Sequence, residues 1–143
     1  MTRPVTLRIV VRDPLEGVEL RLQRGRDQLV PPVTRSASAA TFEFALDTRT
    51  QPDGITALRG PEVQGKPGAR FVYINSGTYA GQSDSPWGRR AKVSLTGLSE
   101  EMLASALARP GSVIQATIDG RGRDGGPAAA TIPLLDGGWR VID

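Results

Sequence analysis

Hydrophobic and polar residues alternate along much of the chain, which is the pattern of β-strands with one face in a core. Apolar side chains occupy every second position between residues 5 and 11, and the alternation resumes between residues 18 and 22. Asp13-Pro14 and Gly17 interrupt the pattern between these two stretches. We therefore predict a β-hairpin whose two apolar faces cover one core.

Later parts of the chain predict further strands. Alternation recurs at residues 42–46, 91–95, 113–118, 128–134 and 139–142. Residues 70–74 are apolar on both faces, which predicts a strand in the interior of a sheet. Asp136-Gly137-Gly138 predicts a tight hairpin between the last two stretches, because such turns need positive φ angles. Residues 48–69 lose the pattern among polar residues, glycine and proline, so we predict a long loop there.

One helix is predicted, over residues 100–108. Ser99 is a suitable N-cap, and two glutamates follow it at the positive end of the helix dipole. Pro110-Gly111 ends the helix. Its apolar stripe is expected to close one open end of the sheet or barrel, and it consists of Met102, Leu103, Ala106 and Leu107.

These elements predict one mainly β domain spanning residues 1–143, since the chain has the usual length of a single domain. About eight strands and one short helix, connected mostly by turns, favour an antiparallel barrel or a two-layer sandwich. The sequence leaves open which of the two it is.

Two absent residue types restrict the chemistry. The chain has no cysteine, which excludes disulfides and sulfur-ligated zinc. It has no histidine either, which excludes a Ser–His–Asp triad and the commonest general base. Acid–base chemistry would fall to Asp, Glu, Tyr or Lys.

Charge adds little to this picture. Eighteen basic residues against fifteen acidic ones give a net charge of +3, and all the basic residues except Lys66 and Lys92 are arginine. Arginine binds phosphate and carboxylate groups in a bidentate manner, but a GC-rich bacterial gene is the simpler explanation of this composition. No apolar run approaches the ~20 residues that span a membrane, and no signal-peptide pattern follows Met1, so we expect a cytoplasmic protein without a membrane partner.

The irregular segment 75–90 is the first candidate site. Gly77 and Gly81 bracket Thr78-Tyr79-Ala80, and glycine allows a backbone to approach a ligand closely. Residues of this segment offer stacking and anion recognition, namely Asn75, Thr78, Tyr79, Trp87, Arg89 and Arg90. The alternative is a self-packed loop in which Trp87 fills the edge of the core.

Residues 119–127 form the second candidate. Their glycines, with Arg121 and Arg123, suggest a backbone nest for phosphate or carboxylate. The segment lacks the Gly-Lys-Ser/Thr ending of a P-loop and the ligand spacing of an EF-hand. A solvated hairpin loop is the alternative.

Metals, cofactors and nucleic acid are not expected. The candidate carboxylates all lie in predicted turns, where hydrogen bonding alone favours Asp; they are Asp84, Asp119, Asp124 and Asp136. No predicted strand carries the paired aromatic residues of a base-stacking surface, and acidic residues are interleaved with the arginines.

The run Arg70-Phe71-Val72-Tyr73-Ile74-Asn75-Ser76-Gly77-Thr78-Tyr79-Ala80-Gly81-Gln82 resembles a bacterial family of uncharacterised small proteins. The same resemblance extends to Ser85-Pro86-Trp87, Arg89-Arg90-Ala91-Lys92-Val93, Gly122-Arg123-Asp124-Gly125-Gly126-Pro127 and Gly137-Gly138-Trp139, and so covers nearly the whole chain. It implies no activity, cofactor or catalytic residue.

Three functional hypotheses follow. The first is a non-enzymatic binding domain for a small anionic ligand or a protein partner, using the residues named above in the two glycine- and arginine-containing segments. The second is a histidine-free enzyme of the isomerase or lyase type, with Tyr79 or Tyr73, an Asp and an Arg in a barrel pocket. The third is a homo-oligomer with an exposed apolar edge near Trp139 or Phe71.

Overall fold

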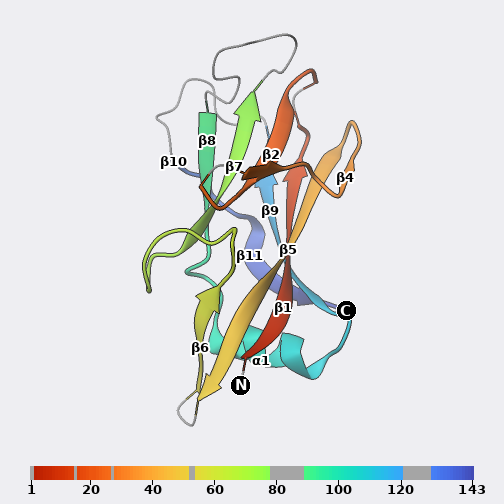
Figure 1. Ribbon diagram of the computed structural model, residues 1–143. Coiled ribbons are helices and arrows are strands. Elements are labelled where there is room, and N and C mark those ends of the chain that lie inside the picture. Colours follow the sequence, from red (N-terminus) through yellow and green to blue (C-terminus); the bar gives the residue numbers. More distant parts are fainter. Residues whose placement is uncertain (1, 15, 27, 52–53, 78–88, 121–129) are drawn as a thin grey trace.

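The computed structural model describes residues 2–14, 16–26, 28–51, 54–77, 89–120 and 130–143. These residues form eleven strands and one helix (Figure 1). The elements are β1 Thr2–Arg12, β2 Glu19–Arg24, β3 Gln28–Val30, β4 Thr34–Arg35, β5 Ala39–Gln51, β6 Gly54–Arg59, β7 Phe71–Gly77, β8 Arg89–Ser94, α1 Glu100–Ala108, β9 Val113–Asp119, β10 Ala130–Thr131 and β11 Leu135–Ile142.

Two sheets contain all of these strands. The first has the order β11-β9-β1-β5-β4, with β6 paired to β5. The second has the order β10-β8-β7-β2-β3. Most pairs are antiparallel, and the pairs β1–β9 and β8–β10 are parallel. Among the described strands the sheets stay separate, so of the two predicted alternatives the closed barrel is wrong, whereas the mainly β class with one helix is confirmed.

One hydrophobic core lies between strands of both sheets. Alternate residues of β1 and β5 enter it from the first sheet, and alternate residues of β2 and β7 enter it from the second. Trp139 of β11 is 4% exposed, and its Nε1 donates a hydrogen bond to the Ser94 carbonyl oxygen at the end of β8, 3.1 Å away. This bond connects the two sheets directly.

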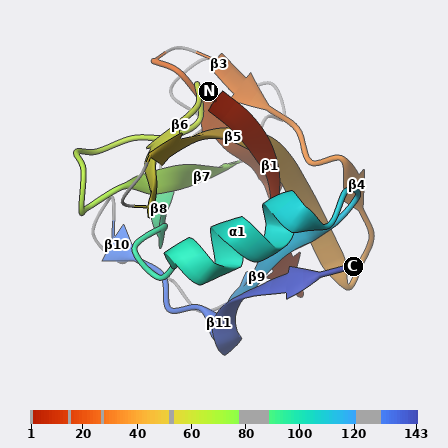
Figure 2. The ribbon, with the colours of Figure 1, turned by 90° about the horizontal axis from the view of Figure 1, so that it is seen from below.

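The predicted helix is confirmed at both of its ends. The Ser99 side chain caps α1 by accepting a hydrogen bond from the Met102 backbone nitrogen, and Leu103 and Ala106 are buried. The helix lies across one end of the molecule, against β1, β6, β9 and β11 (Figure 2).

The predicted hairpin of residues 5–11 and 18–22 is wrong, although both stretches are strands. β1 pairs with β5 and β9, whereas β2 pairs with β3 and β7 in the other sheet. Alternation shows only that each strand has one buried face, and two such faces can cover a core from opposite sides. The conformations at Asp13 (φ 53) and Gly17 (φ 78) belong to the connection between the sheets.

The predicted hairpin at Asp136-Gly137-Gly138 is also wrong. All three residues have positive φ angles, as expected, but they lie within β11, where the register against β9 shifts between Leu135 and Arg140. Such a shift is a β-bulge or a larger irregularity of the strand, since residues 136–139 lie against the single residue 116 of β9, and glycine at positive φ is typical of both bulges and tight turns. Of the preceding predicted strand, 128–134, residues 130–131 form β10, which joins the other sheet, and residues 132–134 belong to no strand. Residues 128–129 lie outside the described residues.

The long loop predicted over residues 48–69 is wrong in its first half. β5 continues to Gln51, and β6 returns from Gly54, with Gln51 opposite Gly54. The sequence Pro52-Asp53-Gly54 is a turn signal. The alternation of β6 is weak, because Ile55 and Ala57 share one parity and Leu58 has the other, and β6 lies at an edge of the sheet, where β5 is its partner among the described strands.

Trp139→Phe tests the connection between the sheets. The variant keeps an aromatic ring but leaves the Ser94 carbonyl without its donor, so we expect the free energy of unfolding to fall by about 2 kcal/mol. Denaturant unfolding measures this change. Val33→Ala is the control, because Val33 is 58% exposed and should change stability by less than about 0.5 kcal/mol. Equal stability of the two variants would contradict the structure.

Candidate functional site

The outer face of β7 carries the candidate site. Val72 and Ile74 are buried in the core, so the alternation of the strand directs Phe71, Tyr73 and Asn75 to the opposite face. β7 is the middle strand of its sheet and is therefore flanked by β2 and β8. The expected position in the interior of a sheet is confirmed, but the two faces of the strand differ.

Neighbouring strands place basic residues beside these side chains. Asn75 lies opposite Arg21 of β2 and Arg90 of β8, and these three positions form one row across the sheet. Tyr73 lies opposite Lys92 in the next row. Asn75 and Arg90 were both predicted as site residues, and the register of β7 with β8 brings them together.

Asn75 is unusual for an outward-facing residue because it is only 4% exposed. Its Nδ2 donates to Gln23 Oε1 over 3.5 Å, which is at the long end of the hydrogen-bond range. Gln23 in turn donates from Nε2 to the Gly25 carbonyl oxygen, 3.1 Å away. The amide of Asn75 is thus oriented by a side chain that is itself tied to the β2–β3 turn.

An aromatic and cationic cluster lies next to Asn75. The rings of Phe71 and Tyr73 meet edge to face, with centroids 4.9 Å apart and planes inclined by 70°. The Lys92 ammonium lies over the Phe71 ring, 4.5 Å from its centroid. This geometry is a cation–π contact.

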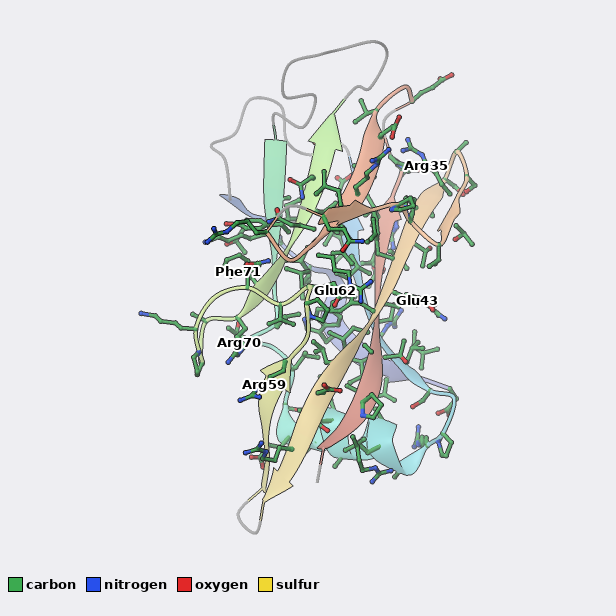
Figure 3. The ribbon with its side chains drawn as sticks, in the orientation of Figure 1. Arg35, Glu43, Arg59, Glu62, Arg70 and Phe71 are labelled. Carbon is green, nitrogen blue, oxygen red and sulfur yellow. The ribbon has the colours of Figure 1, made fainter. Side chains whose placement is uncertain are left out.

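Residues 60–70 hold the Phe71 ring from another side (Figure 3). Gln64 and Phe71 exchange two backbone hydrogen bonds of 2.8 and 3.1 Å. Gly65 has a φ angle of 85°, and a methyl group there would lie 2.6 Å from the Ala69 carbonyl oxygen and 2.9 Å from Phe71 Cε1. Only glycine allows this close approach.

Glu62 anchors the same segment from inside. It is 8% exposed, and its carboxylate lies 3.6 Å from Arg24 Nε. The neighbouring Pro61 carbonyl oxygen accepts a hydrogen bond from the Gly25 backbone nitrogen at 2.6 Å. The segment is therefore attached to the β2–β3 turn as well as to β7.

The two sheets differ in the charge of their outer faces. The outward positions of β2, β7 and β8 contain three basic residues and one acid, which are Arg21, Arg90, Lys92 and Glu19. Arg21 donates to Glu19 at 3.0 Å, so part of this charge is offset.

The first sheet is closer to balance. The outward positions of its strands carry five basic and four acidic residues, which are Arg8, Arg12, Arg49, Arg59 and Arg140 with Glu43, Asp47, Asp119 and Asp136. Two ion pairs, Arg8–Glu43 and Arg12–Asp136, join members of this set. The excess of basic over acidic residues at these positions is therefore larger on the second sheet than on the first.

Other predicted site residues are only partly described. Arg89 begins β8 opposite Ser76, and the backbones of Arg89 and Arg90 are placed by the register. Thr78, Tyr79, Trp87, Arg121 and Arg123 lie outside the described residues.

The described ends of the two predicted segments lie on the same side of the molecule, away from α1 (Figure 1). β7 ends at Gly77 and β9 ends at Asp119. Ala130, which follows the second segment, pairs with Ala91 of β8.

Sequence analysis missed Arg21, Phe71, Tyr73 and Lys92 as members of one face. The sequence does indicate that Arg90 and Lys92 lie on one face, because they alternate with the apolar residues at positions 91, 93 and 95. Phe71 and Tyr73 gave no such signal, since both faces of residues 70–74 are apolar.

The alternative hypotheses stay predictions. Tyr73 is half-buried on the sheet face, and Tyr79 lies outside the described residues. Trp139, named for an oligomer interface, is buried in the core.

The described residues contain no group of three or more acidic side chains placed to hold a metal; Asp84 and Asp124 lie outside them. No helix in the part of the chain that the structure describes is long and apolar enough to cross a membrane.

The fold and this face define a mainly β protein with a basic, partly aromatic sheet surface. The chain belongs to a family of unknown function, DUF5990, whose model matches residues 5–142. Comparison with curated proteins and with solved structures finds no match. The family match confirms the resemblance over nearly the whole chain, whereas bacterial origin and a cytoplasmic location stay predictions.

Gly65→Ala and Gly68→Ala form a matched pair that tests the packing of residues 60–70 on Phe71. Both glycines have positive φ angles, but a methyl group at Gly68 would contact nothing within 4 Å. We expect Gly68→Ala to lower the free energy of unfolding by about 1 kcal/mol through backbone strain alone. Gly65→Ala should cost at least about 1 kcal/mol more in denaturant unfolding, because its methyl group also clashes with Phe71. Equal losses would show that the segment does not pack on the ring.

Proposed function

We propose that this protein is a non-enzymatic binding domain for a small anionic ligand, held on the outer face of β2, β7 and β8. The row Arg21–Asn75–Arg90 is the single observation that carries the proposal. A face with this composition offers a charged group on each side of a neutral amide, which is a common arrangement for binding carboxylate or phosphate.

Dimensions of the sheet support this assignment. Adjacent strands lie about 4.8 Å apart, so the backbones of Arg21 and Arg90 are about 10 Å apart across Asn75. An arginine side chain is long enough to span half of this separation, so we infer that both arginines of the row bind the same small anion. Asn75 lies between them at 4% exposure, with its Nδ2 donating to Gln23 Oε1.

Both predicted segments fit this location. Residues 78–88 connect β7 to β8, and residues 121–129 connect β9 to β10. Ser76 and Arg89, which flank the first segment, and Ala130, which follows the second, lie at the Asn75 end of the sheet. We therefore include Thr78, Tyr79, Trp87, Arg89, Arg121 and Arg123 in the proposed binding site.

The finer architecture is part of the proposal. We infer a two-layer sandwich, because one core is lined by alternate residues of two separate sheets. The face that binds the ligand is then the outer surface of one layer.

A thermal-shift series tests the proposal with inorganic phosphate, sulfate, citrate and oxalate at constant ionic strength. An anion present at ten times its dissociation constant should stabilise the protein by about 1.4 kcal/mol, which raises the melting temperature by roughly 3–6 °C. Arg90→Gln should lose most of this shift, because the variant removes a charge from the central row.

Arg140→Gln is the matched control for that series. Arg140 is exposed on β11 of the first sheet, so its loss should leave the shift unchanged. The proposal fails if no anion stabilises the protein, or if Arg140→Gln reduces the shift as much as Arg90→Gln.

A further inference from the structure

The connection between β6 and β7 contains a short β-hairpin, residues 64–71, which we call the basic hairpin. Its first and last residues exchange two backbone hydrogen bonds of 2.8 and 3.1 Å. The Ala69 backbone nitrogen donates to the Lys66 carbonyl oxygen over 2.9 Å, with Pro67 and Gly68 between them and a φ angle of 86° at Gly68. This is a type II turn, which favours proline at its second residue and glycine at its third.

The basic hairpin projects from the body of the protein beside β6 and β7 (Figure 1 and Figure 2). Residues 65–69 are all exposed. Apart from Lys66, their side chains are small, because the other four residues are two glycines, a proline and an alanine. The hairpin is therefore a narrow convex element whose tip a partner can reach.

Several contacts hold the basic hairpin in place before any partner binds. Gly65 lies directly against the Phe71 ring, and the Lys92 ammonium lies 4.5 Å from the centroid of the same ring. Glu62, which precedes the hairpin, is buried and lies 3.6 Å from Arg24 Nε. An element that is ordered in advance loses little conformational entropy on binding, so more of its contact energy contributes to affinity.

Basic and acidic residues are separated within the stretch 59–70. Glu62 is its one acidic residue and is buried, whereas Arg59 and Lys66 are exposed and Arg70 is half-buried. Figure 3 shows Arg59 and Arg70 on the side of the molecule from which the hairpin projects. In the part of the chain that the structure describes, none of these three basic side chains has an ion pair or a hydrogen bond.

Asp47 of β5 lies opposite Arg59 in the strand register and offsets part of its charge, although no ion pair joins these two described side chains. The surplus of positive charge therefore comes mainly from Lys66 and Arg70, which belong to the hairpin itself.

We propose that the basic hairpin is a docking element for an acidic segment of a partner protein, whose carboxylates bind Lys66 and Arg70. Arginine binds a carboxylate in a bidentate manner, and lysine attracts it as a point charge. The small residues of the turn allow the backbone of an extended segment to approach closely. This surface is separate from the proposed anion site, because Phe71 and Asn75 are four residues apart on β7, or about 13 Å.

Composition favours a polypeptide over other polyanions. The turn carries no large apolar or aromatic side chain among its described residues, and such side chains are what anchor a protein in a membrane surface. The Phe71 ring at the base of the hairpin is engaged within the protein by Tyr73, Lys92 and Gly65. It is therefore not the open stacking surface that single-stranded nucleic acid uses.

The first experiment measures binding of a fluorescein-labelled oligoglutamate to the unaltered protein by fluorescence anisotropy. Oligoglutamine of the same length is the neutral probe, oligothymidylate is the nucleic-acid probe, and phosphatidylserine vesicles are the membrane probe, all at one ionic strength. We expect oligoglutamate to bind more tightly than the other three. Failure of oligoglutamate to bind would overturn the inference, and so would equal or tighter binding of oligothymidylate, the vesicles or oligoglutamine.

The second experiment compares two double variants that each lose two positive charges. Lys66→Gln/Arg70→Gln alters the hairpin, and Arg49→Gln/Arg140→Gln alters exposed residues of the first sheet. An exposed ion pair changes affinity by up to about fivefold, so the hairpin variant should bind oligoglutamate at least about fivefold more weakly. The control should bind within about twofold of the unaltered protein. Melting temperatures measured without ligand identify a variant that fails to fold, and equal affinities of the two folded variants would overturn the inference.

A third variant separates this surface from the anion site. Arg90→Gln, which lies in the central row of the sheet face, should bind oligoglutamate normally. Weakened binding by Arg90→Gln together with normal binding by Lys66→Gln/Arg70→Gln would place the acidic segment on the sheet face. That result would overturn the docking inference and leave the proposed anion site standing.

Discussion

The positions of the described candidate residues on the second sheet depend on the two-residue period of β7. Val72 and Ile74 are buried in the core between the sheets, and burial of such side chains stabilises a fold by about 1.5–3 kcal/mol each. A shift of one residue in the register would move these side chains to the surface and bring Phe71 and Tyr73 into the core. The core therefore fixes the outer face. Because β2 and β8 pair with β7 in a single register each, Arg21, Arg90 and Lys92 are placed by the same constraint.

The outer faces of the two sheets differ in charge. Stability does not explain this difference, because surface charge contributes little to the free energy of unfolding. Exposed ion pairs contribute about 1 kcal/mol or less, so the pairs Arg8–Glu43 and Arg12–Asp136 are not needed to hold the first sheet together. They offset part of the charge of that face. On the second sheet, Glu19 offsets Arg21, and the described strands place no acid opposite Lys92 or Arg90. The outward strand positions of the second sheet therefore carry the larger excess of positive charge, which favours an anion over this face.

Sequence patterns predicted the local structure of this chain better than its pairings. The helix was predicted to the residue because Ser99 and Pro110-Gly111 are local signals. The inward residues of β1 and β5 followed from alternation in the same way. Pairing is not local: alternation in β1 and β2 fits one sheet or two, and positive φ angles at Asp136-Gly137-Gly138 fit a turn or a bulge. For the same reason Asn75 and Arg90 could be proposed as site residues, but the contribution of Arg21 depends on which strand lies beside β7.

Asn75 brings these arguments together. Asparagine is disfavoured in strands, and burial of a polar side chain costs free energy unless hydrogen bonds compensate for it. Within the described residues, the Asn75 Nδ2 donates to Gln23 Oε1, and Gln23 donates in turn to the Gly25 carbonyl oxygen. These two bonds hold the amide in the row between Arg21 and Arg90 and connect that row to the β2–β3 turn. Strand register and side-chain hydrogen bonding therefore act together at Asn75, and the proposed anion site depends on both.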